Sequence, residues 1–218
     1  MSLSVCAVPA KVDWAESWWK PRFESKIKDS QNHKYNVVFF GDSIIHKYED
    51  DGLKAWQLFS EYRSYLNLGF SGDMTEHLLW RIQNGALDYI QPQKIVIMIG
   101  TNNTGLRFDS VQDVFLGIQA VVKSIEIQKP QAQIILLGLL PRSRSHYHKF
   151  RIRNNEINAK LLQWSNNKQK IRYFDFSALF LRGNKTISKD VMPDALHLSE
   201  AGYTILTRAL KPIIENES

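Results

Sequence analysis

The stretch Val37-Val38-Phe39-Phe40-Gly41-Asp42-Ser43-Ile44 decides the fold class of this chain. Four consecutive apolar residues are followed directly by a glycine and two polar residues. A short apolar run without alternation is typical of a strand buried on both faces, as the strands of a parallel sheet are. The polar residues then mark the carboxyl end of a strand, where the working groups of such sheets gather.

The same kind of apolar run recurs along the chain. Further buried strands are expected at Tyr65–Leu68, Lys94–Ile99, Gln133–Leu137 and Ile171–Phe174. Amphipathic patterns, with apolar residues three and four positions apart, predict helices at Trp14–Lys28, Thr75–Arg81, Val111–Gln128, Arg153–Trp164 and Ser199–Ile214. Strands that alternate with helices predict an α/β protein, a three-layer α/β/α sandwich around a five-stranded parallel sheet.

The length and composition predict one globular domain over residues 1–218. The chain has 218 residues, 44% of them hydrophobic, and roughly 100–200 residues form one domain. We expect the N-terminal segment 1–30 to pack a helix on the core of that domain. The single cysteine, Cys6, excludes an intrachain disulfide and any multi-cysteine metal site.

Charge and hydropathy indicate which partners and which cellular compartment to expect for this chain. The net charge of +6 suits anionic partners, or simply a solvated basic surface. No apolar run approaches the ~20 residues of a membrane span, so no stable membrane insertion is expected. No apolar leader precedes Asp13–Trp19, which predicts a cytoplasmic chain as written. Residues 1–10 would equally suit the remnant of a removed export leader.

Ser43, Asp194 and His197 have the residue types of a serine hydrolase. Ser43 follows the first strand, and a serine becomes a good nucleophile when an imidazole takes its proton. That imidazole needs a carboxylate to fix its tautomer. Asp194 precedes His197 by three residues, and a turn of that length lets the two side chains meet. Taken singly, Asp42-Ser43 also suits a helix cap, and His197 a loop histidine before the last helix.

Gly72 and Asn102 follow the second and third strands. An acyl-transfer enzyme needs preorganised donors for the oxyanion of its tetrahedral intermediate. A glycine lets its backbone N–H approach a substrate closely, and an asparagine amide supplies a second donor. Ordinary turn chemistry would explain both residues as well.

Four blocks of the sequence resemble, in order, those of the SGNH/GDSL hydrolase superfamily: Gly41-Asp42-Ser43, Gly72, Gly100-Thr101-Asn102-Asn103 and Asp194-x-x-His197. Within it, residues 36–212 are most similar to the catalytic subunits of intracellular platelet-activating-factor acetylhydrolase of type Ib. The segments that carry this similarity include Val37–Ser43, His77–Gly85 and Leu137–Arg142. The segment Trp18–Glu24 instead resembles bacterial GDSL-type esterases, many of them exported.

The resemblance implies a flavodoxin-like fold and a role for each motif residue. Ser43 would be the nucleophile, His197 the general base, and Asp194 the residue that orients it. The backbone N–H groups of Ser43 and Gly72 and the Asn102 side chain would form the oxyanion hole.

The resemblance also implies a small acyl pocket, which favours an acetyl group. Ile44, Thr101 and Leu196 match positions that close this pocket, although core packing would explain Ile44 and Leu196 equally well. Asn103 stands where many members of the superfamily have Asp, and the acetylhydrolase group shares the Asn.

The segment Pro141–Asn154 is strongly basic and follows the fourth strand. Five cations lie in it without an acidic residue: Arg142, Arg144, Lys149, Arg151 and Arg153. Part of the segment should reach the rim of the site, with Arg142 and Arg144 as candidate contacts for an anionic substrate, either a phosphate head group or an acidic or sulfated sugar. A solvated loop is the competing interpretation.

We therefore expect a serine esterase acting on short-chain, chiefly acetyl, esters without a cofactor or metal. A polysaccharide O-acetyl esterase is one alternative, and a non-catalytic binding module is another. Ser71 is interpreted as a turn residue, and the remaining histidines lack metal-ligand spacing: His33, His46, His77, His146 and His148. The expected partner is a small-molecule or saccharide acetyl ester. Nucleic acid is not expected, and a homodimer is left open.

Overall fold

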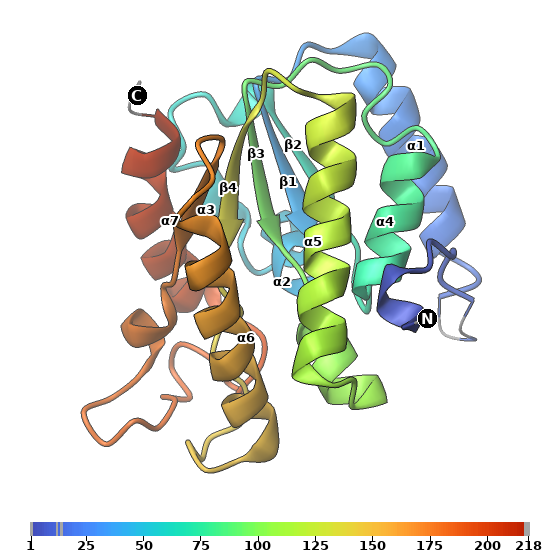
Figure 1. The fold of residues 1–218 in the computed structure, drawn as a ribbon. Coiled ribbons are helices and arrows are strands. Elements are labelled where there is room, and N and C mark those ends of the chain that lie inside the picture. Colours follow the sequence, from blue (N-terminus) through green and yellow to red (C-terminus); the bar gives the residue numbers. More distant parts are fainter. Residues whose placement is uncertain (1, 12, 14, 216–218) are drawn as a thin grey trace.

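The computed structural model describes residues 2–11, 13 and 15–215 and arranges them in three layers (Figure 1). The middle layer is a parallel sheet of five strands: β1 (Val37–Gly41), β2 (Tyr65–Gly69), β3 (Lys94–Met98), β4 (Gln133–Leu137) and β5 (Ile171–Phe174). The strand order is β2-β1-β3-β4-β5. This confirms the predicted sandwich, and each strand lies where its apolar run predicted it.

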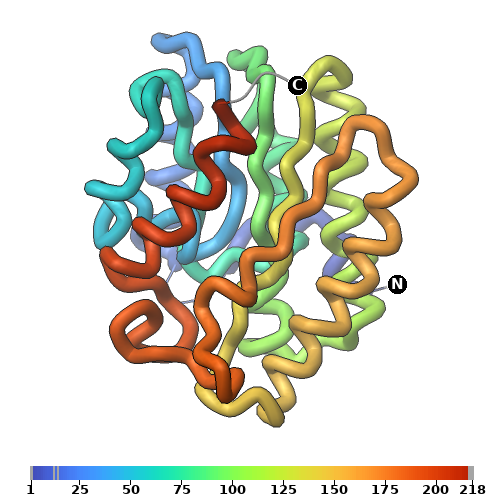
Figure 2. Tube along the Cα trace, turned by 90° about the vertical axis from the view of Figure 1, so that its left-hand side faces the viewer, coloured from blue at the N-terminus to red at the C-terminus, as the bar shows by residue number. Residues whose placement is uncertain are grey.

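Helices cover both faces of the sheet. One face carries α1 (Trp19–Asn32), α4 (Thr75–Gln83), α5 (Val111–Gln128) and α6 (Lys149–Ser165). The opposite face carries α2 (Ser43–His46), α3 (Leu53–Trp56) and α7 (Glu200–Glu215). Figure 2 is turned toward this second face and shows α7, in red, passing in front of the strands.

Short helical turns fill several connections. Among the described residues, four are 3-10 turns, at Leu3–Val5 (η1), Lys47–Glu49 (η2), Tyr62–Ser64 (η3) and Ser177–Phe180 (η5), and one is a π-helical turn at Asn103–Arg107 (η4). The η4 turn begins at Asn103, the last residue of the Gly100–Asn103 motif, at the carboxyl edge of the sheet. Single π turns are frequent at functional sites.

The side chains of each strand alternate between two separate cores. In β1, Val38 and Phe40 belong to the core under α1, α4, α5 and α6. Val37 and Phe39 belong to the core under α2, α3 and α7. Both faces of the strand are therefore dry, which is why the sequence shows an unbroken apolar run.

Helix α1 begins later than the sequence pattern predicted. We expected a helix from Trp14, which lies outside the described residues, whereas the helix begins at Trp19. Pro21 explains the difference, because proline is tolerated only in the first turn of a helix. Trp19 and Phe23 of α1 pack into the first core, as expected for the N-terminal segment.

The longest helix, α5, buries the stripe that its sequence pattern predicted. Its buried apolar residues are Val114, Ile118, Val121, Val122 and Ile125. The rest of its surface is mostly polar, although Leu116 and Ile127 are exposed. No helix in the described part of the chain combines the length and the apolar character needed to cross a bilayer.

The carboxyl edge of the sheet is packed too closely for a side chain at Gly69. A Cβ there would overlap the backbone nitrogen of His46 and lie 2.6 Å from the carbonyl carbon of Ile45. The end of β2 therefore lies directly against α2, the short helix that begins with Ser43. Gly183, by contrast, has no heavy atom within 4 Å of such a Cβ.

We predict that Gly69→Ala lowers the free energy of unfolding by about 1–3 kcal/mol, the usual cost of overpacking. Urea unfolding should show a lower midpoint with an unchanged slope. The matched variant Gly183→Ala should leave the midpoint nearly unchanged. An equal effect of both substitutions would show that the contact between β2 and α2 is not tight.

Candidate active site

Ser43 is the first residue of α2 and follows β1 after a single residue. Asp42 caps this helix, since its Oδ1 accepts a hydrogen bond from the N–H of Ile44 at 3.0 Å. The helix-cap interpretation is thus correct for Asp42, and it does not exclude a chemical role for Ser43. Ser43 is 6% exposed, and its N–H points from the start of a helix, where developing negative charge is favoured.

His197 lies between Ser43 and Asp194. Its Nε2 is 2.9 Å from Ser43 Oγ, and its Nδ1 is 2.7 Å from Asp194 Oδ2. A carboxylate only accepts hydrogen bonds, so Nδ1 carries the proton and Nε2 is left as the acceptor for the Ser43 hydroxyl. This is the arrangement in which an imidazole can take a proton from serine.

The Asp194 carboxylate is held ionised by its own turn. Burial raises its pKa, but hydrogen bonds from the His197 ring and from two backbone N–H groups lower the pKa below its ordinary value. The N–H groups of Leu196 and His197 donate to Asp194 Oδ1 at 2.9 and 2.7 Å. Ala195 has a left-handed backbone, with φ of 59°. Strained conformations of this kind persist where the surroundings enforce them.

The segment after β4 braces this turn. The N–H of Ser143 donates to Ala195 O at 2.8 Å, and Arg144 Nη2 donates to Pro193 O at 2.8 Å. Both contacts flank Asp194. The turn that carries the histidine is therefore anchored to the sheet through the loop of a neighbouring strand.

The Gly72 turn and Asn102 lie together, as the strand ends predicted. Gly72 adopts φ of 78°, a conformation that glycine adopts without strain. Asn102 Nδ2 donates to the carbonyl oxygen of the next residue, Asp73, at 3.0 Å. Asn102 follows β3 and Ser43 follows β1, so the site lies where the strand order reverses, the usual binding crevice of open α/β sheets.

The sequence interpretation missed the buried ion pair of Asp73 and Arg81. Arg81 donates from Nε and Nη2 to Asp73 Oδ2 at 2.9 and 2.7 Å, and Trp19 Nε1 donates to Asp73 Oδ1 at 2.7 Å. Arg81 Nη1 also reaches Leu68 O at 3.0 Å. Both charged side chains are fully buried. The available signal in the sequence was Asp73 itself, an acidic residue directly after Gly72.

The hydrogen bonds of Asn103 explain why this chain has Asn where many members of the superfamily have Asp. Its Oδ1 accepts from the N–H of Thr75 at 3.0 Å, and its Nδ2 donates to Glu76 Oε2 at 3.1 Å and to Asp109 Oδ2 at 3.0 Å. An aspartate here would place a third carboxylate beside two others. The amide is therefore the chemically suited side chain.

The three residues expected to close an acyl pocket lie around the carboxyl edge. Ile44 and Thr101 are buried, and Leu196 is half-buried in the Asp194 turn. Ile44 belongs to the core under α7, and its carbonyl accepts from Tyr203 Oη at 2.8 Å. The Thr101 carbonyl accepts from Arg142 Nη1 at 2.7 Å.

The basic segment is not uniformly available to a ligand. Arg151 is 2% exposed and donates to the carbonyl oxygens of Arg142, Ser143 and Lys185. Arg151 therefore stabilises the loop and is not available to a ligand, whereas the candidate contacts are Arg142 and Arg144. Arg142 is half-buried beside Thr101, whereas Arg144 is exposed.

His77 caps a helix, and Trp80 packs against other aromatic rings. His77 Nδ1 accepts from the N–H of Met74 at 3.1 Å at the start of α4. Trp80 lies 5.6 Å from Trp19 and 5.4 Å from Phe23, ring to ring. Across the described residues, no group of three or more His, Cys, Asp or Glu side chains is placed to hold a metal.

Sequence relatives of this chain are acetylhydrolase subunits. It is 35% identical over 197 residues to platelet-activating factor acetylhydrolase IB subunit alpha1 of Homo sapiens, which covers 90% of this chain and 82% of the relative. It is 34% identical over 211 residues to the alpha2 subunit of Gallus gallus, covering 95% and 89%.

Solved structures share the fold. A GDSL-like lipase of Bacteroides thetaiotaomicron superposes with a TM-score of 0.72 at 19% identity, covering 89% of this chain and 96% of the other. An acetylxylan esterase of Geobacillus stearothermophilus gives 0.65 at 18% identity, covering 86% and 96%. The model of the GDSL-like lipase/acylhydrolase family matches residues 39–205. The chain therefore belongs to the GDSL-like lipase/acylhydrolase family.

Proposed function

We propose that this carboxylic ester hydrolase cleaves short-chain, chiefly acetyl, esters through an acyl-enzyme on Ser43. The observation that carries the proposal is the chain of hydrogen bonds from Ser43 through His197 to Asp194, at 2.9 and 2.7 Å. A serine, an imidazole and a carboxylate at these distances have the geometry of nucleophile, base and orienting group.

In the first half of the reaction, Ser43 Oγ bonds to the ester carbonyl carbon and its proton passes to His197 Nε2. The carbonyl π electrons move onto oxygen. When the intermediate collapses, the carbon–oxygen bond to the alcohol breaks, and the imidazolium gives its proton to the leaving oxygen. Asp194 stabilises the imidazolium because its carboxylate faces Nδ1.

In the second half, water takes the place of the alcohol. His197 Nε2 accepts a proton from the water as it attacks the acyl carbon, and the carboxylic acid leaves as Ser43 recovers its proton. The oxyanion of each tetrahedral intermediate is stabilised by the N–H groups of Ser43 and Gly72 and by the Asn102 amide. One N–H of that amide already donates to Asp73 O, so the other is the one offered to substrate.

We predict that Ser43→Ala lowers kcat for p-nitrophenyl acetate by several orders of magnitude while the fold is kept, because the nucleophile is lost. Purified variant and wild type are compared by release of p-nitrophenolate. The control is Ser71→Ala, at the serine directly before Gly72, which should keep most of its activity. Wild-type activity in Ser43→Ala with loss in Ser71→Ala would refute the assignment.

Acyl specificity is proposed to come from Ile44, Thr101 and Leu196. Ile44 is buried in a packed core, and packed cores accommodate added methylenes poorly. Thr101 is held through its backbone carbonyl, which accepts a hydrogen bond from Arg142. An acyl site bounded by such residues accepts an acetyl group and rejects longer chains by overlap.

We predict that kcat/KM falls steeply from acetyl to butyryl to octanoyl esters of p-nitrophenol. Each step adds methylenes that a closed pocket has no room for. The same series on Ile44→Ala should fall less steeply, because the substitution enlarges the pocket. Rates that rise with chain length would instead indicate a lipase-like enzyme.

The alcohol part of the substrate is proposed to be anionic. Arg142 bonds the carbonyl of Thr101, the residue before Asn102, and Arg144 lies beside the turn of Asp194. A planar guanidinium suits phosphate, carboxylate and sulfate groups. The acetylhydrolase relatives favour a phosphate head group, and an acidic or sulfated acetylated sugar offers the same chemistry.

We predict that KM for an anionic acetyl ester rises with salt, whereas KM for a neutral ester barely moves. The Debye length shrinks from ~10 Å at 0.1 M to ~3 Å at 1 M, which screens attraction to exposed cations. Replacing Arg142 and Arg144 together by Ala should abolish the difference between the two esters. Equal salt responses in the wild type would mean that the segment is an ordinary solvated surface.

A further inference from the structure

Ser71 forms two hydrogen bonds with one atom of His46. The Ser71 Oγ is 2.9 Å from His46 Nδ1, and the Ser71 backbone N–H donates to the same Nδ1 at 3.2 Å. His46 is the last residue of α2, the one-turn helix that begins with Ser43. Ser71 directly precedes Gly72. A single short helix thus carries Ser43 at one end and, at the other, the ring that holds the Gly72 turn.

The backbone donor fixes the protonation state of His46. A backbone N–H only donates, so Nδ1 must present its lone pair, and the proton of the neutral ring resides on Nε2. A proton on Nδ1 would face the Ser71 N–H and break the contact. Nδ1 of His46 therefore accepts hydrogen bonds. In His197, by contrast, Nδ1 carries the proton and donates to Asp194.

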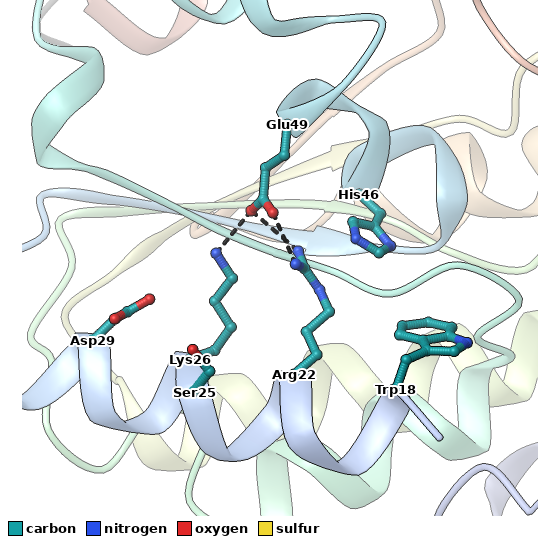
Figure 3. Close-up of a pocket in the computed structure, with 7 residues that line it drawn as sticks. All are labelled: Trp18, Arg22, Ser25, Lys26, Asp29, His46 and Glu49. Carbon is teal, nitrogen blue, oxygen red and sulfur yellow. Dashed lines mark hydrogen bonds and ion pairs between the residues drawn. The ribbon is translucent and has the colours of Figure 1, made fainter. Parts of the chain in front are cut away.

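The surroundings of His46 keep it neutral. Figure 3 shows the ring beside Trp18. Both side chains line a cavity of about 530 Å³, which Arg22, Lys26 and Glu49 also border. Burial lowers the pKa of His46 to about 4; the nearby Arg22 and Lys26 also lower it, while Glu49 and Asp50 act in the opposite direction. The lone pair at Nδ1 is accordingly available throughout the neutral range.

Phe70 and Asn67 connect the same two segments. The His46 ring lies 6.5 Å from that of Phe70 and 5.6 Å from that of Trp18. Asn67 donates to Ile45 O at 2.8 Å and accepts from the N–H of Gly69 at 2.8 Å. These contacts hold α2 against β2 as far as Gly69. The hydrogen bonds of His46 to Ser71 connect α2 to the following turn as well.

We infer that His46 is a positioning residue. Its unprotonated Nδ1 accepts hydrogen bonds from Ser71 and thereby orients the N–H of the next residue, Gly72, toward the oxyanion. We call this contact the grip of His46 on Ser71. The inference rests on the proposed function, in which Gly72 and Ser43 supply oxyanion donors. Because α2 carries both Ser43 and His46, the grip fixes the two donors relative to each other. Donors of this kind are effective only when they are aimed before the reaction begins.

The test compares His46→Leu with His46→Asn on p-nitrophenyl acetate. Leucine fills the space between Trp18 and Phe70 but accepts no hydrogen bond. Asparagine Oδ1 stands as many bonds from Cα as Nδ1 does, so it can accept from Ser71 N–H. We expect kcat to fall about 10-fold or more in the leucine variant, short of the ~10²–10³-fold lost when a donor is removed outright. The asparagine variant should recover most of this loss.

Two further readouts separate positioning from a general structural effect. KM should stay within about twofold of the wild type. Affinity for a trifluoromethyl ketone, whose adduct with Ser43 carries the oxyanion, should weaken by the factor by which kcat falls, since such an adduct mimics the transition state. His33→Leu, at an exposed histidine after α1, is the matched control and should change neither quantity.

Three results would overturn the inference: unchanged kcat in a folded His46→Leu, a lower kcat with unchanged ketone affinity, or no recovery in His46→Asn. Should the leucine variant fail to fold, the nitrogen NMR shifts of His46 in the wild type decide. They must show Nδ1 unprotonated at pH 7, and a proton there refutes the grip. An active Ser43→Ala variant would instead refute the proposed function, so the two failures are distinguishable.

Discussion

The buried pair of Asp73 and Arg81 is the interaction on which the rest of the site depends. It joins four parts of the fold: α1 through the Trp19 indole, α4 through Arg81 itself, the end of β2 through the carbonyl of Leu68, and the loop after β3 through Asn102 on the Asp73 carbonyl. The guanidinium also lies 4.0 Å from the centre of the Phe70 ring. Buried charges are costly unless they are paired and hydrogen-bonded, and here both oxygens of the carboxylate are satisfied.

Because this pair is fully enclosed, the Gly72 turn has little freedom to move. Asp73 follows Gly72 directly, so every group that holds Asp73 also fixes the position of the turn. The grip of His46 on Ser71 acts on the residue before Gly72. The turn is therefore held from both sides of the glycine, by a charged network on one side and by a neutral imidazole on the other. In the proposed mechanism, an oxyanion donor that is fixed in this way needs little reorganisation when charge develops.

The turn that carries Asp194 and His197 is stabilised in a different way, by hydrogen bonds from a neighbouring loop. The Asp194 turn comes from a long irregular connection between β5 and α7, and the loop after β4 stabilises it. Ser143 and Arg144 donate to carbonyl oxygens on either side of Asp194, and Arg151 in turn braces that loop through carbonyl oxygens. A guanidinium group has several N–H donors in a rigid plane. It can therefore stabilise a loop by donating to backbone carbonyl oxygens that have no partner in a sheet. Much of the basic charge after β4 thus has a structural use.

Sequence patterns were enough to predict the strands, the order of the motifs along them, and the meeting of Ser43, Asp194 and His197. These follow from local rules: unbroken apolar runs define buried strands, and a three-residue spacing lets a carboxylate meet its own histidine. The start of α1 was predicted too early, because the apolar pattern continues before Trp19 while Pro21 has to lie in the first turn of the helix. The pairing of Asp73 with Arg81, the burial of Arg151 and the hydrogen bond from Ser71 to His46 became visible only in the folded chain. These are contacts between segments far apart in the chain, made across the carboxyl edge of the sheet. No local pattern encodes them, because which side chains meet there depends on how the helices pack and on which backbone groups are left in need of a partner.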